Sequence, residues 1–119
     1  MDYLQKQGLV PTSEEYGIDF KYQMRSFSIL IDDDDEQFLR IVMPCIFSVT
    51  DENRVEVLEA INVVNMGVKV SKTGIWGEDS VSIFIETLLD KDPALDDIIP
   101  RSLNIMLYTR DEFFKALQG

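Results

Sequence analysis

Apolar and polar residues alternate in three segments of the first half of the chain, at residues 18–22, 27–31 and 38–43. The apolar positions on one side of each segment are Ile18, Phe20 and Tyr22, then Phe27, Ile29 and Ile31, then Leu39, Ile41 and Met43. A period of two is typical of half-buried β-strands. The spacing predicts a three-stranded antiparallel meander, with a tight turn at residues 23–24 and an acidic turn from Asp32 to Glu36.

Helical spacing replaces this alternation in the middle of the chain. The pattern predicts a helix over residues 51–66, with N-cap candidates before it and Gly67 at its end. Its apolar stripe consists of Val57, Leu58, Ile61 and Val64. Val55, Val63 and Met66 lie off this stripe, which favours a second contact surface on the helix. Asn65 is interpreted as a residue that helps to end the helix, in preference to a polar binding pair with Asn62.

The remaining elements complete a small α+β domain. A short helix is expected over residues 3–9. A second hairpin is expected over residues 68–71 and 81–86, with a loop at residues 72–79. The last helix is expected over residues 101–117, and Pro100 separates it from a short helical piece. The order is α-β-β-β-α-β-β-α. We expect one domain over residues 1–119, with a mostly antiparallel five-stranded sheet, the first and last helices packed on one face, and the second helix between the hairpins.

Several apolar residues fall on the strand positions that point away from this core. Leu30, Phe38, Val42 and Phe84 share one sheet face if the predicted register holds, and exposed patches of this kind mark interfaces. The alternative is that the second helix covers them within one molecule. Trp76 lies in the predicted loop, where an indole either folds over the core, which we favour, or contacts a partner. These five residues are the candidate partner-binding set.

Charge and cysteine content limit the classes of partner and the location that we expect for the protein. The chain has 22 acidic and 11 basic residues, and its net charge of −11 repels nucleic acid and anionic membranes. With neither a signal-like N-terminus nor an apolar run of membrane-spanning length, a cytoplasmic protein is expected. Cys45 is the single cysteine, so it forms no internal disulfide, and its apolar neighbours predict a buried, inert thiol.

The residues predict no catalytic, cofactor or metal site. The sequence has no histidine, and Asp19, Glu59 and Glu86 fall on polar positions of their elements. The glycines around Trp76 lack the spacing and the lysine of a phosphate-binding loop. The acidic run invites a calcium hypothesis, but an EF-hand counted from Asp32 would require other residues than Gln37 and Met43 at its sixth and twelfth positions. We therefore prefer a solvated turn.

Certain short stretches resemble the YbjN family, small bacterial proteins that share the fold of type III secretion chaperones. They are LVP at residues 9–11, DFKY at 19–22, FSILI at 27–31, FLRI at 38–41, VVN at 63–65 and VKV at 68–70. The resemblance covers nearly the whole chain. It implies a sheet with helices on one face, frequent dimerisation, a role in binding other proteins and the label of sensory transduction regulator. It supplies no functional residues to transfer.

The sequence therefore favours a non-catalytic protein-binding domain, a chaperone-like or regulatory adaptor that forms a homodimer and engages an extended client through a sheet face or strand edge. A ligand-sensing regulator is the alternative, with a pocket between the last helix and the sheet lined by residues such as Met106, Tyr108 and Phe113. An enzyme that uses carboxylates alone is the weakest of the three.

Overall fold

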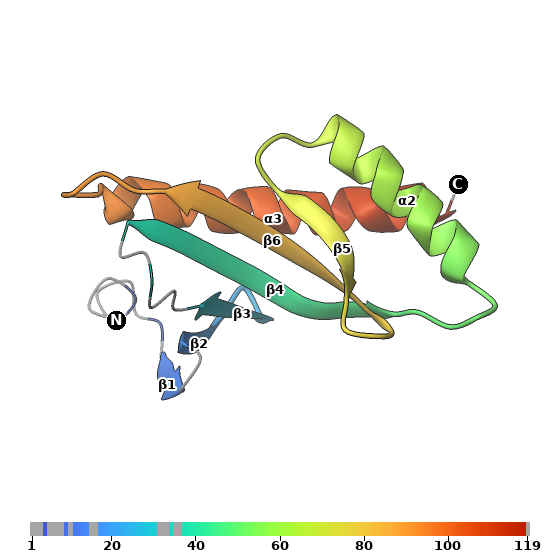
Figure 1. Ribbon diagram of the computed structural model, residues 1–119, viewed down its shortest axis with the longest axis horizontal. Coiled ribbons are helices and arrows are strands. Elements are labelled where there is room, and N and C mark those ends of the chain that lie inside the picture. Colours follow the sequence, from blue (N-terminus) through green and yellow to red (C-terminus); the bar gives the residue numbers. More distant parts are fainter. Residues whose placement is uncertain are drawn as a thin grey trace.

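The computed structural model describes residues 4, 9, 11–14, 17–30, 34 and 37–118 as an α+β fold (Figure 1). Its elements are β1 (Thr12–Glu14), β2 (Gly17–Tyr22), β3 (Arg25–Leu30), β4 (Phe38–Ser48), α2 (Arg54–Gly67), β5 (Lys72–Trp76), β6 (Ser80–Leu88) and α3 (Leu95–Gln118). The helix expected over residues 3–9 falls mostly outside the described residues, as do Ile31 and the acidic run apart from Asp34. Leu4 is described and lies buried in the core.

The described strands form one antiparallel sheet in the order β1-β2-β3-β4-β6-β5. The sheet has six strands where the sequence predicted five. The additional strand is β1, which pairs with β2 through Thr12 opposite Asp19. Its three residues are polar and show no apolar alternation, so periodicity alone does not reveal it. From β2 to α3, the observed element order matches the predicted one.

The core lies between α3 and one face of the sheet. Phe20 and Phe27 stack there with ring centroids 5.7 Å apart. Ile41 and Ile85 are paired opposite each other on β4 and β6, and both are fully buried. The predicted strand faces are therefore confirmed for the described residues. From α3, the core receives Ile99, Leu103 and Met106, whose spacing of three and four residues places them on one side of the helix.

The second helix extends the same layer. Val57, Ala60 and Val64 of α2 pack with Val81 of β6 and Phe113 of α3 in a second buried cluster. Figure 1 shows α2 lying across the C-terminal half of α3, beside β5. Both described helices therefore contact the core side of the sheet.

The second hairpin begins later than the sequence predicted. Residues 68–70 are a bend, in which Val70 has a positive φ of 76°, and the strand runs over residues 72–76 that were expected to be a loop. The hairpin turn is residues 77–79, where Gly77 has a φ of 78° that favours glycine. The chain uses the Val68 to Ser71 segment to reverse direction after α2, so alternation there does not indicate a strand.

Pro100 does not interrupt the last helix, which runs without a break from Leu95 to Gln118. Proline removes one backbone hydrogen bond and crowds the preceding turn, and this predicted a break or a kink. The predicted break is absent, because Ile99 and Leu103, on either side of Pro100, are both buried in the core. Their packing holds the first turns of α3 in line with the rest.

Cys45 is exposed, which contradicts the predicted buried thiol. The pairing of β4 with β6 shifts register between Met43 and Phe47, and Cys45 within this bulge has a positive φ of 55°. The backbone N–H of Cys45 donates to Ser82 Oγ at 3.1 Å. The bulge re-aims the side chain toward solvent, an effect that strand alternation cannot predict.

Candidate functional site

One face of the sheet points away from both described helices. Cross-strand pairs share a face, and Val42 is paired with Ser28 on β3 and with Phe84 on β6, while Phe38 is paired with Leu88. We call this surface the open face; its residues are Leu30, Phe38, Arg40, Val42, Lys72, Trp76, Phe84, Glu86 and Leu88. The predicted common face of Leu30, Phe38, Val42 and Phe84 is confirmed. Neither α2 nor α3 covers it, since both pack on the core side.

The apolar side chains of the open face differ in their exposure. Val42 is only 1% exposed, so neighbouring atoms cover it and it is not available to a partner. Leu30, Phe38 and Phe84 are half-buried. Leu88 is 81% exposed, and sequence analysis missed it although it follows Phe84 by four residues on the same strand and therefore on the same face.

Trp76 belongs to the strand β5 and not to a loop, and it does not fold over the core. Its side chain is 48% exposed and lies edge-on against Phe84, with ring centroids 5.4 Å apart. Because Trp76 is paired with Ser80 and Lys72 with Phe84, the indole lies on the open face. It is the only tryptophan in the chain, so it is a natural fluorescent probe of this surface.

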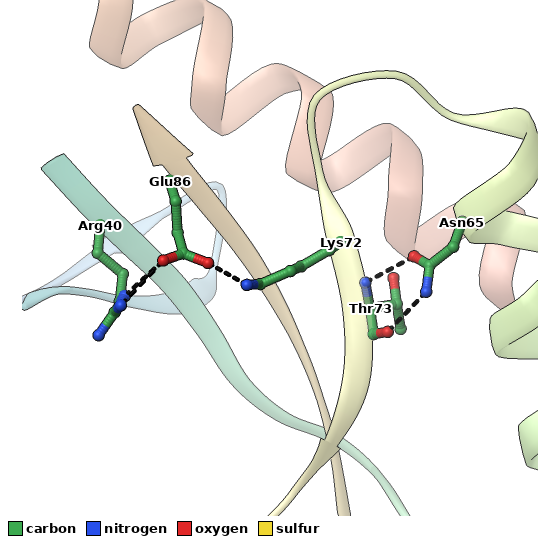
Figure 2. A network of polar contacts seen from close by, with 5 residues as sticks. All are labelled: Arg40, Asn65, Lys72, Thr73 and Glu86. Carbon is green, nitrogen blue, oxygen red and sulfur yellow. Dashed lines mark hydrogen bonds and ion pairs between the residues drawn. The ribbon is translucent and has the colours of Figure 1, made fainter. Parts of the chain in front are cut away.

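A cluster of three charges crosses the middle of the open face. Glu86 of β6 accepts from Arg40 of β4, at 2.9 Å from Nη2 and 3.3 Å from Nε, and its other carboxylate oxygen pairs with Lys72 of β5. Figure 2 shows the two cations approaching Glu86 from opposite sides. The Arg40 guanidinium also lies 5.2 Å from the centroid of the Phe38 ring. The cluster carries two positive charges and one negative charge.

The two cations determine the ionisation of Glu86. Its pKa lies below the usual value of 4.5, first because of the hydrogen bond from Lys72 and then because of that from Arg40, while partial burial acts in the opposite direction. A general acid at neutral pH requires a raised pKa instead. Glu86 is thus arranged to remain a carboxylate and to hold the two cations in place.

The outer edge of β5 is capped by a side chain of α2. The Asn65 amide donates to the Thr73 carbonyl at 2.9 Å and accepts from the Thr73 N–H at 2.8 Å (Figure 2). These two bonds imitate those of a neighbouring strand, and they occupy the backbone groups that another chain would need at this position. The helix continues to Gly67, so Asn65 does not end it as predicted. Its role in the structure is to seal an edge.

A second exposed apolar surface lies on the outer side of α2. Its members are Val55, Leu58, Val63 and Met66, and we call them the α2 stripe. Met66 is 82% exposed and Val55 68%. Two cavities of about 330 and 310 Å³ adjoin Val63, and both are bounded across from α2 by Ala116 of α3. Val55, Val63 and Met66 are thus exposed off the buried side of α2, as predicted, whereas Leu58, which was predicted on the buried side, is 48% exposed and its place there is taken by Ala60.

The residues proposed for a ligand pocket are not brought together. Met106 and Phe113 are fully buried in two different clusters, whereas Tyr108 is exposed and borders the larger of the two cavities beside α2. The carboxylates considered for catalysis are also dispersed. Asp19 accepts from Ser28 Oγ at 2.6 Å on β2 and β3, while Glu59 is exposed on α2.

Metal-binding clusters and membrane-spanning helices are both missing from the part of the chain that the structure describes. Within the described ranges, no three carboxylate or thiol groups gather as metal ligands do. Neither α2 nor α3 has the length and apolar character of a membrane-spanning helix.

Comparison with known proteins identifies the fold. No protein-family model matches the sequence, and no curated protein matches it. YbjN of E. coli, described as "a putative transcription regulator", superposes with a TM-score of 0.74 at 7% identity, over 97% of this chain and 86% of that chain. An uncharacterised protein from Methanothermobacter thermautotrophicus superposes with a TM-score of 0.72 at 12% identity, over 98% of this chain and 92% of that chain. The fold is YbjN-like, as the sequence resemblance implied.

Proposed function

We propose that this chain is a non-catalytic regulatory or chaperone-like adaptor that binds a segment of another polypeptide on its open face. The observation that supports this most strongly is a sheet surface with exposed Trp76 and Leu88 that neither described helix covers. Aromatic residues are enriched where proteins contact one another. The carboxylates weighed for catalysis are dispersed or held by cations, which favours binding over chemistry.

The face is a better binding surface than the edge of β5. A peptide that adds a strand needs free backbone N–H and C=O groups, and Asn65 already occupies those of Thr73. We therefore propose that the partner lies across β4, β6 and β5 and inserts apolar side chains around Phe84. The regulator-like neighbour of the same fold is compatible with such a role.

Peptide selection tests this proposal and does not require the natural partner to be identified first. A phage library of random linear 12-residue peptides is selected on the wild-type chain, and enriched peptides are titrated against two double variants. Trp76→Ser with Leu88→Ser removes open-face contacts, and Val55→Ser with Met66→Ser removes exposed residues of the α2 stripe as a matched control. We expect at least a tenfold loss of affinity only for the first variant. Failure to enrich any peptide, or equal affinity for both variants, would contradict the proposal.

We further propose that the chain forms a homodimer through the α2 stripe. Four large apolar side chains exposed along one helix, beside two cavities, are the kind of surface that a monomer seldom leaves uncovered. This contact would leave the open face available to a client. Static light scattering at protein concentrations between 1 and 200 µM tests for this homodimer. A constant monomer mass over this range would contradict the proposed dimer.

A further inference from the structure

The charge cluster on the open face has hydrogen-bond donors to spare but no spare carboxylate oxygen. Both oxygens of Glu86 are engaged, one by Lys72 and the other by Arg40. Arg40 uses its Nε and Nη2 for this contact, so Nη1 has no partner among the described residues, and Lys72 uses one of its three ammonium hydrogens. A group that completes the cluster must therefore bring hydrogen-bond acceptors, and the two positive charges against one negative charge favour an anionic acceptor.

The surroundings of the cluster select the kind of anion. Arg40 lies against the Phe38 ring, and Lys72 is paired across from Phe84, whose ring contacts Trp76. Apolar and aromatic surface thus flanks the cations on the same face. Beside such surface, a charge-assisted hydrogen bond is stronger than in open water. The arrangement suits a carboxylate that has apolar residues on either side of it.

We infer that the open face recognises an extended acidic segment, in which an Asp or Glu side chain lies over Glu86 and accepts from the remaining donors of Arg40 and Lys72, while neighbouring apolar residues pack on Phe84, Trp76 and Leu88. This inference depends on the proposed function and specifies the chemistry of the partner. A protein with a net charge of −11 would repel an acidic segment elsewhere. The local excess of positive charge therefore determines where such a segment binds and how it is oriented.

Three variants and one peptide change test the inference. In each selected peptide that binds the open face, every acid is replaced by its amide, and affinities are measured from the fluorescence of Trp76. We expect a tenfold or greater loss with the amide peptide. Arg40→Gln with Lys72→Gln should cause a similar loss, whereas Glu86→Gln should tighten binding because it removes the internal competitor. Lys91→Gln, at an exposed lysine outside the cluster, is the control and should change nothing.

The outcomes separate the inference from the function on which it rests. Peptides that bind the open face equally well as acids and as amides would overturn the inference and leave the adaptor role intact. Weaker binding to the Glu86→Gln variant would also overturn it, since Glu86 would then contribute to the contact. The absence of any open-face peptide would contradict both. Circular dichroism and a urea titration of each variant establish that a loss of binding is not a loss of fold.

Discussion

At the scale of single residues, polar side chains make contacts in this structure that an apolar pattern does not predict. Nothing in the helical pattern distinguishes Asn65 from its neighbours, yet its amide forms two hydrogen bonds with Thr73 at the edge of the following strand, β5. The alternation of β2, β3 and β4 was predictable because burial on one face enforces it. The contacts between Asn65 of α2 and β5, and between Lys72 and Glu86, depend on tertiary position. They were therefore not predictable from the sequence.

Replacement of Asn65 by alanine should destabilise the fold. It removes two hydrogen bonds and leaves the Thr73 N–H and C=O without their present partner, which should lower the free energy of unfolding by about 1–3 kcal/mol. Urea unfolding measures this change. Asn62→Ala, at an exposed position three residues earlier in the same helix, is the matched control and should stay within about 0.5 kcal/mol of wild type. Equal effects of both variants would show that the edge contact contributes no stability.

The ion cluster predicts a pH dependence of stability. Because the pKa of Glu86 is lowered in the folded chain, its contribution is present at pH 7 and is lost as the pH falls below 4.5 and through the lower folded value. The Glu86→Gln variant should therefore be less stable than wild type at pH 7, and the difference should shrink by pH 3. Urea midpoints at both pH values test this. A difference that is independent of pH would contradict the assigned coupling.

At the scale of elements, the sequence predicted which helices and strands exist better than it predicted where each of them begins and ends. The strands from β2 to β4 and both described helices were found, because burial on one side imposes their periods. The strand β5 was misplaced by several residues. Val68 and Val70 alternate with polar residues, but the chain must turn back there after α2, and Val70 takes up a left-handed conformation. A strand cannot be located from alternation alone where a reversal of the chain precedes it.

The α2 stripe gives a prediction at the same scale. If it forms the dimer contact, then Val55→Ser with Met66→Ser should weaken self-association at least tenfold, because about 0.8 kcal/mol is lost for each methylene no longer buried. The Trp76→Ser and Leu88→Ser variant should dimerise like wild type. Sedimentation equilibrium provides the association constants. Dimers that dissociate only when the open face is changed would place the contact on the sheet instead.

At the scale of the whole molecule, the two proposed contacts should respond to salt in opposite directions. Two copies that each carry a charge of −11 repel one another, and added salt screens this repulsion, so the dimer should tighten. An acidic peptide held by Arg40 and Lys72 should bind more weakly when salt is added.

The fold itself was accessible from the sequence through its YbjN resemblance, and the superposition with YbjN confirms it. The charge cluster was not, because its three members come from separate strands.

Peptide binding to the open face is tested best by observing which residues a selected peptide contacts. Amide and indole NMR signals of the isotope-labelled chain are recorded as peptide is added, which reports on each residue separately. We expect the largest shifts at Trp76, Phe84 and Leu88, with little change along α2. Shifts concentrated on the α2 stripe or along the outer edge of β5, with the Trp76 indole unmoved, would contradict binding at the open face.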